Sequence, residues 1–168
     1  MTQVTFQTNM GAITIEVDHE NAPIGAENFV HYAMEGYYNG TIFHRIIPGF
    51  MVQGGGFLPG LVEKDAGEPI ENEADNGLKN VRGALSYART NDPHSATTQF
   101  FMNLVDNPYL DHTSKDVHGW GYAVFGRIVE GLAILDEMAK VDTTSRRGHQ
   151  DVPVEDIIIE KTLVKESD

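Results

Sequence analysis

Cysteine is missing from the 168 residues of this sequence. Without cysteine the chain has no disulfide framework and no thiolate metal site, which suits a reducing compartment. Residues 1–6 lack the basic and apolar regions of a signal peptide, and no apolar stretch approaches the roughly 20 residues that span a membrane. We therefore expect a cytoplasmic protein with no membrane partner.

Basic residues are scarce. The sequence has 12 lysines and arginines against 25 aspartates and glutamates, which gives a formal net charge of −13. Nucleic-acid backbones and anionic membranes would repel such a chain, so we expect neither as a partner. With 40% hydrophobic and 22% charged residues, the composition is that of an ordinary globular protein. The length predicts one domain over residues 1–168, which we expect to be a monomer.

The common signatures of metal, nucleotide and serine-hydrolase sites are also missing. None of the seven histidines forms a His-Glu-x-x-His or His-x-His pair, and no serine lies in a Gly-x-Ser-x-Gly segment. The glycines at residues 54–56 lack the spacing of a phosphate-binding loop, and a strand end that needs special backbone angles explains them better. We expect no metal and no cofactor.

The hydrophobic patterns predict a mostly β chain with two helices and two long polar loops. The helices are expected at residues 24–35, just after Pro23, and at residues 132–138, and the loops at residues 55–82 and 106–121. Because strands and helices do not alternate, the sheet should be mostly antiparallel, and the pattern leaves a sandwich and a barrel both open. The strands are expected at residues 4–8, 13–17, 42–47, 50–53, 84–88, 99–104, 122–129 and 157–164.

One arginine lies alone in the apolar run FHRIIPGFMVQGGG, which covers residues 43–56. In an extended strand the side chain of Arg45 would share a face with Phe43 and Ile47, while His44 would point the other way in a structural role. A guanidinium is costly to desolvate unless other groups accept its hydrogen bonds. Spacing alone leaves two readings open, a functional arginine and one satisfied in a buried structural pair. Downstream, Gln99-Phe100-Phe101-Met102 repeats the mixture of amide, aromatic and thioether groups.

These two segments resemble the cyclophilin family of peptidyl-prolyl cis-trans isomerases, and the resemblance extends over nearly the whole chain. It is closest to the bacterial, cytosolic and cyclosporin-insensitive subgroup. The family implies a closed, eight-stranded antiparallel β-barrel capped by two α-helices. It also implies an enzyme that accelerates rotation about X-Pro bonds in peptides and unfolded proteins and so assists folding.

The chemistry of that reaction gives the unusual arginine a role. Rotation of an X-Pro bond breaks amide conjugation and leaves a lone pair on the imide nitrogen, so a donor aimed at this nitrogen binds the twisted state best. Arg45 is our candidate for that donor, and the resemblance adds Phe50 and Gln53 as catalytic positions. Gln53 could orient Arg45 or reach the substrate. The expected substrate-binding positions are Met51, Ala88, Arg89, Thr90, Gln99, Phe101, Tyr109, Leu110 and Tyr122.

Three of these positions depart from much of the family, which has tryptophan at Tyr109, histidine at Tyr122 and asparagine at Arg89. Loss of the indole predicts only weak affinity for cyclosporin. The added charge of Arg89 predicts a preference for acidic residues beside the proline. Three alternatives to an isomerase stay open: a proline-peptide-binding module or chaperone with negligible turnover, a lipocalin-type ligand barrel and a metal-dependent barrel enzyme.

Overall fold

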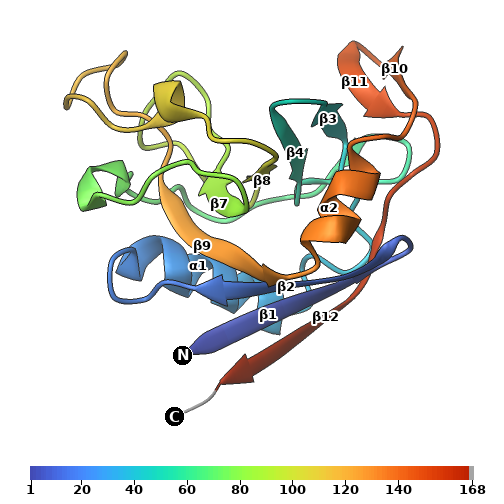
Figure 1. Ribbon diagram of the computed structural model, residues 1–168, viewed down its shortest axis with the longest axis horizontal. Helices are drawn as coiled ribbons and strands as arrows, with labels where there is room; N and C mark the ends of the chain where they lie inside the picture. Colours follow the sequence, from blue (N-terminus) through green and yellow to red (C-terminus); the bar gives the residue numbers. More distant parts are fainter. Residues whose placement is uncertain (167–168) are drawn as a thin grey trace.

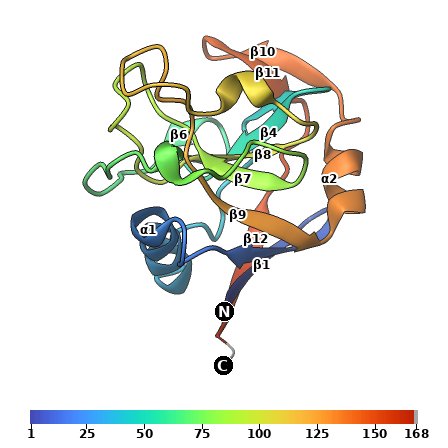
Figure 2. The same ribbon diagram turned by 60° about the vertical axis from the view of Figure 1, so that its left-hand side comes forward.

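An antiparallel sheet of eight strands forms most of the molecule in the computed structural model, which describes residues 1–166 (Figure 1). The predicted domain of residues 1–168 therefore extends two residues past the described range. Helix α1 spans Pro23–Met34 and helix α2 spans Leu132–Met138, and they lie on opposite sides of the curled sheet in both views (Figure 2). The sheet has the order β12 (Ile159–Glu166), β1 (Thr2–Thr8), β2 (Gly11–Val17), β9 (Val124–Glu130), β7 (Ala84–Tyr87), β8 (Phe100–Asn103), β4 (Met51–Gly54) and β3 (Arg45–Ile47).

The sheet curls so far that its two edges meet. The backbone N–H of Phe43 donates to the carbonyl of Ile157 at 3.0 Å, and the N–H of Ile159 donates to the carbonyl of Thr41 at 2.9 Å. These bonds join the segment before β3 to the start of β12 and the residues just before it, which covers part of the edges that an open sheet would expose. The predicted mostly β architecture, with eight antiparallel strands and two helices, is confirmed, and a short bridge closes the curl.

Alternating side chains explain the hairpin of β1 and β2. Val4 pairs with Ile15 and Phe6 with Ile13, and all four side chains are fully buried on the inner face. Helix α1 begins at Pro23, whose missing N–H costs nothing in the first turn. Its next N–H groups, on Ile24 and Gly25, donate to the carboxylate of Glu73 at 3.1 and 2.7 Å. A side chain from a distant loop therefore caps this helix, and its negative charge suits the helix N-terminus.

Aromatic rings fill the interior of the curl. Phe6 stacks on Phe100 with centroids 5.5 Å apart, and Phe29 from α1 meets both rings edge-on. Tyr38 is fully buried beside them and donates a hydrogen bond to the carbonyl of Thr98. A filled interior differs from the open cavity that the lipocalin-type alternative requires.

Both predicted loops contain short elements, and one hairpin was missed. The 55–82 loop contains a short antiparallel pair, β5 (Phe57–Leu58) with β6 (Val62–Glu63), and a 3₁₀ turn at Ala74–Asn76. A hairpin of β10 (Thr143–Arg146) and β11 (His149–Pro153) was not predicted, because its strands are short and carry little hydrophobic alternation. It lies next to β3 (Figure 1). The 106–121 loop also holds a 3₁₀ turn at Pro108–Leu110.

Candidate active site

Strand register brings Arg45, Gln53 and Phe101 together. Arg45 pairs with Gln53 between β3 and β4, and Gln53 pairs with Phe101 between β4 and β8. Paired residues on adjacent strands point to the same face, so these three side chains share the outer face of the sheet. Their neighbours Ile46 and Met102 point inward and are fully buried in the main core. The amide, the guanidinium and the phenyl ring therefore lie side by side because the apolar neighbours fix the register.

The predicted shared face of Phe43, Arg45 and Ile47 is wrong for Phe43. Strand β3 begins only at Arg45, and Phe43 is fully buried in the main core, where it meets Phe100. Ile47 does lie on the side of Arg45, against a separate outer cluster. His44 is 4% exposed and packs on Phe57, which agrees with its expected structural role.

A second apolar cluster lies outside the main core and forms a small cavity beside Arg45. Met51, Phe101 and Leu110 are buried in it, while Phe50 and Tyr122 pack at its margin. The cavity has a volume of about 130 Å³. That is below the ~300–1,000 Å³ of sites that hold whole small molecules, so it suits one side chain. Nine of the twelve predicted positions line it: Arg45, Phe50, Met51, Gln53, Ala88, Arg89, Phe101, Leu110 and Tyr122.

Two glutamines orient Arg45. Its Nη1 donates to Oε1 of Gln53 at 3.3 Å, and Nε2 of Gln53 donates to Oε1 of Gln99 at 3.1 Å. Gln99 in turn lies on Gly56, where a Cβ atom would come within 2.5 Å of its Cγ. Within residues 1–166, no carboxylate lies at ion-pair distance from Arg45, whose side chain is exposed. The guanidinium is therefore directed by amides and keeps donors available for a ligand.

The other three predicted positions lie around the cavity. Gln99 acts through Gln53 as just described. Tyr109 is 71% exposed and stacks on Phe50 with centroids 6.0 Å apart, so it forms a rim. Thr90 is exposed, donates a hydrogen bond from its hydroxyl to that of Ser95 at 2.8 Å and does not line the cavity.

Arg89 lines the cavity, but its donors are largely used by the backbone. Nε and Nη2 both donate to the carbonyl of Gly121, at 3.2 and 2.9 Å, and Nη1 donates to the carbonyl of Thr90 at 2.9 Å. The guanidinium also lies 4.5 Å from the centre of the Tyr122 ring. Arg89 thus fastens the 121–122 segment to the end of β7 and fixes the tyrosine wall.

An asparagine that the sequence reasoning missed holds Phe50 in place. The side-chain amide of Asn107 donates to the carbonyl of Phe50 at 3.1 Å and to Oδ1 of Asn103 at 2.8 Å. Asn107 is 2% exposed although it lies in a polar loop. No sequence signal separates it from the surface asparagines around it, because its importance comes only from the approach of the 50–51 backbone.

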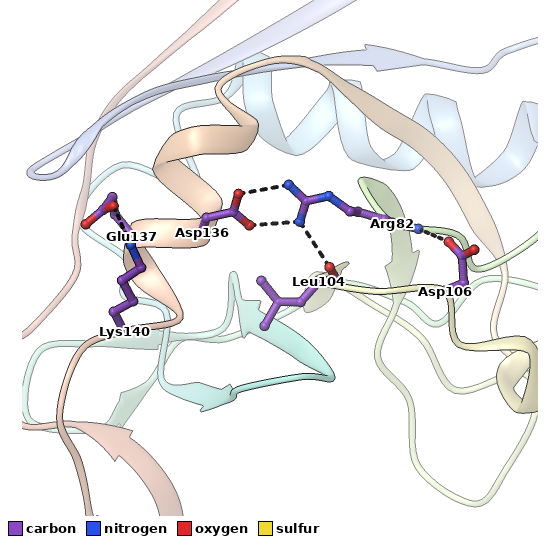
Figure 3. A network of polar contacts seen from close by, with 6 residues as sticks. All are labelled: Arg82, Leu104, Asp106, Asp136, Glu137 and Lys140. Atoms are coloured by element: carbon purple, nitrogen blue, oxygen red, sulfur yellow. Dashed lines mark hydrogen bonds and ion pairs between the residues drawn. The ribbon is translucent and has the colours of Figure 1, made fainter.

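The loop that carries Leu110 is also anchored to α2. Arg82 makes two hydrogen bonds to the carboxylate of Asp136, at 2.8 and 2.9 Å, and a third to the carbonyl of Leu104 at 3.0 Å (Figure 3). Its backbone N–H donates to Asp106 at 2.9 Å. The hydrogen bonds to Arg82 lower the pKa of Asp136. One arginine therefore ties α2 to the start of the loop behind the cavity.

A larger cavity of about 570 Å³ lies elsewhere, over β2, β9 and the 78–81 loop. Its lining mixes Glu16, Asp18, Lys79 and Arg127 with scattered apolar groups. Arg127 there is paired with Glu16 at 3.4 Å. Size alone does not make it the better candidate, because acidic and basic groups share its lining and its arginine is already paired with Glu16.

Residues 1–166 hold no group of three or more histidine, aspartate or glutamate side chains placed to bind a metal ion. Neither α1 nor α2, the two α-helices of the described range, is long and apolar enough to cross a membrane.

The chain is similar to known proteins in both sequence and fold. Residues 3–164 match the family model described as cyclophilin type peptidyl-prolyl cis-trans isomerase/CLD. The chain is 53% identical over 163 residues to peptidyl-prolyl cis-trans isomerase B of Escherichia coli strain K12, covering 97% of this chain and 99% of the relative. It is 52% identical over 164 residues to peptidyl-prolyl cis-trans isomerase cyp18 of Streptomyces antibioticus, covering 98% and 99%.

Among solved structures, the crystal structure of a Cryptosporidium parvum cyclophilin-type isomerase, determined in the presence of the dipeptide Ala-Pro, superposes with a TM-score of 0.81. The two chains are 29% identical, and the match covers 98% of this chain and 99% of the other. The fold, the family model and the relatives lead to one conclusion: this chain belongs to the cyclophilin-type peptidyl-prolyl cis-trans isomerases, enzymes of class EC 5.2.1.8 that act on proline-containing peptides.

Proposed function

We propose that Arg45 catalyses rotation of the X-Pro bond by donating a hydrogen bond to the imide nitrogen as the bond twists. The proline ring would sit in the cavity formed by Phe50, Met51, Phe101 and Leu110. The observation that carries the proposal is a guanidinium with unused donors at the mouth of an apolar cavity that fits one side chain. The mechanism is non-covalent and needs no general base.

The energetics favour the twisted state over the planar one. Rotation about a peptide bond has a barrier of about 18–20 kcal/mol, because conjugation is lost at the midpoint. In the planar amide the nitrogen lone pair is delocalised and accepts hydrogen bonds poorly, whereas the twisted nitrogen accepts them. An interaction made mainly in the transition state raises the rate, and each ~1.4 kcal/mol gives tenfold. A ~10⁵-fold acceleration needs about 7 kcal/mol, so proline anchoring and desolvation must add to one charged hydrogen bond.

Substitution of Arg45 tests this mechanism and also the alternative of a binding module with negligible turnover. NMR exchange on an Ala-Pro peptide would give the isomerisation rate, and a titration would give peptide affinity. For Arg45→Ala we expect kcat/KM to fall by roughly 10²–10³, as for loss of one preorganised donor, while affinity weakens less than about tenfold. Arg127→Ala, which removes an exposed arginine on β9, is the matched control and should leave both values unchanged.

The opposite pattern would contradict the mechanism. If Arg45→Ala kept its rate within about threefold, the donor role would be wrong. If affinity and rate fell equally, Arg45 would serve binding alone. A guanidinium stays charged at all relevant pH values, so we also expect kcat/KM to be nearly flat between about pH 6 and 9. A steep bell-shaped profile would indicate a titrating acid or base instead.

The proposal extends to partners and compartment. We propose that one domain over residues 1–168 acts as a monomer on exposed X-Pro bonds in unfolded chains. We also propose that it is the bacterial cytosolic type of the family. It would bind cyclosporin weakly, because Tyr109 lies at the rim of the cavity. Arg89 would favour acidic residues beside proline, and equal kcat/KM for peptides with Glu or Lys before proline would refute this. Cell fractionation and an inhibition curve with cyclosporin test the remaining points.

A further inference from the structure

Beside the small apolar cavity, called the first cavity from here on, lies a second cavity that adjoins it at Arg45. It is distinct from the 570 Å³ cavity over β2 and β9. It has a volume of about 470 Å³ and shares Arg45 and Gln53 with the small apolar cavity. One wall comes from the sheet, with Arg45, Gln53 and the nearby Gln99, and the other from the β10–β11 hairpin, with Gly148, His149, Gln150 and Asp151. Because the two cavities share Arg45 and Gln53, a residue beside a proline bound in the first cavity would be within reach of the second.

Aromatic packing gives this cavity a firm base. The His44 ring lies 4.5 Å from the Phe57 ring, and His149 stands edge-on to Phe57 at 5.3 Å. His44 is 4% exposed, and among residues 1–166 nothing bonds to its buried Nδ1. The base is thus made of rings that position the hairpin against β3, so the cavity is part of the fold rather than a gap between loops.

Polar groups on the two walls are complementary. On the sheet side, Arg45 uses one nitrogen to bond Gln53, and Gln99 uses its oxygen to accept from Gln53, so N–H groups of both Arg45 and Gln99 stay available. On the hairpin side, Asp151 provides carboxylate oxygens, which only accept hydrogen bonds. Asp151 is held at a φ of 61°, a conformation that fixes where its side chain leaves the hairpin.

We propose that this second cavity is a specificity subsite for the substrate residue next to the prolyl bond, and that it prefers an uncharged amide side chain, Gln or Asn. This rests on the proposed function. An amide offers its oxygen to the donors of Arg45 and Gln99 and its NH₂ group to Asp151. A carboxylate would meet the charge of Asp151, and an ammonium would meet that of Arg45. An apolar side chain would desolvate these groups without replacing their hydrogen bonds.

Two series of short peptides test the proposal. One series varies the residue before proline and the other the residue after it, with Gln, Glu, Lys, Met and Ala in each. Gln, Glu and Met have similar size, so differences among them report polarity. In one of the two series we expect kcat/KM for the Gln peptide to exceed that for the Met and Glu peptides by about fivefold, as for one hydrogen bond in a solvent-accessible site.

Substitution of Asp151 assigns the effect to the hairpin wall. Asp151→Asn keeps a residue that tolerates the positive φ and removes the charge, so the disadvantage of Glu relative to Gln should disappear. Thr144→Ala, on an exposed position of the same hairpin and outside the cavity, should keep the wild-type ratios. Both readouts are ratios within one protein, so a partial loss of folded protein does not alter them.

Each outcome is decisive. Equal kcat/KM for the Gln, Glu and Met peptides in both series would overturn the subsite. If the Ala peptide is still isomerised in that case, the proposed isomerase function is unaffected. The subsite would also be overturned if the Asp151→Asn variant kept the full preference for Gln, with the same Gln-to-Glu ratio of kcat/KM as wild type. If wild-type protein did not turn over the Ala peptide at all, the proposed function would fail and the subsite with it.

Discussion

Acid should destabilise this protein through one buried imidazole. His44 is 4% exposed, lines the second cavity and packs on Phe57. Burial, with smaller contributions from His149 and Arg45, lowers the pKa of His44 from 6.5 to about 4. Nδ1 has no hydrogen-bond partner among residues 1–166, so a charged ring would bury a donor without an acceptor.

The direction of the effect follows from proton uptake. Between about pH 4 and 6.5 the unfolded chain carries a proton on His44 and the folded protein does not, so acidification favours unfolding. The difference between 6.5 and about 4, at roughly 1.36 kcal/mol per pH unit, comes to about 3 kcal/mol. Stability from this group is fully present above pH 6.5 and is lost progressively as the pH falls towards 4.

Urea unfolding at several pH values measures this loss. Other groups also titrate in acid, so the comparison is between wild type and His44→Gln. The variant loses packing at every pH. Between about pH 6.5 and 4, however, its free energy of unfolding should fall by about 3 kcal/mol less than that of wild type. Parallel curves for wild type and His44→Gln would refute the reasoning.

Two further predictions concern the supports of the site. Gly56→Ala should displace Gln99 from Gln53, because the added Cβ would lie 2.5 Å from Gln99 Cγ. We expect kcat/KM on an Ala-Pro peptide to fall about tenfold. If the effects of Gly56→Ala and Gln99→Ala are additive in a double-mutant cycle, this coupling is wrong. Asp136→Asn should lower the free energy of unfolding by about 0.5–1 kcal/mol, since the bond to Arg82 is solvent-exposed. Because Arg82 lowers the pKa of Asp136, this difference should be present at neutral pH and vanish in acid as the carboxylate protonates, and an unchanged difference at low pH would refute the link.

The sequence allowed prediction wherever side chains alternate or motifs are local. The hairpin of β1 and β2, both helices and the outer strands follow from hydrophobic periodicity, and helix α2 has the predicted bounds. Gly55, within the 54–56 glycines, has a φ of 92°, as expected for a strand end with special angles. In these segments the information lies in neighbouring residues, so a single sequence suffices.

Long-range placement could not be predicted in the same way. Asn107 supports Phe50 only because two loops meet, and nothing near Asn107 in the sequence signals that contact. The position of Arg89 beside the cavity was expected, but the sequence did not show that its donors bind the carbonyls of Thr90 and Gly121. The β10–β11 hairpin forms one wall of the second cavity, although its short strands lack hydrophobic alternation. The Gly148 turn after Thr143-Thr144-Ser145 was the available signal.

The position of the two chain ends has a practical consequence. Strands β1 and β12 pair so that Thr2 lies opposite Glu166, and both ends leave the sheet side by side, far from β3, β4 and the β10–β11 hairpin (Figures 1 and 2). A tether, a purification module or a second folded domain attached at either end would leave the first and second cavities unobstructed. Because the ends adjoin, the chain can also be inserted into a surface loop of another protein, which would place an isomerase beside a chosen slow-folding client.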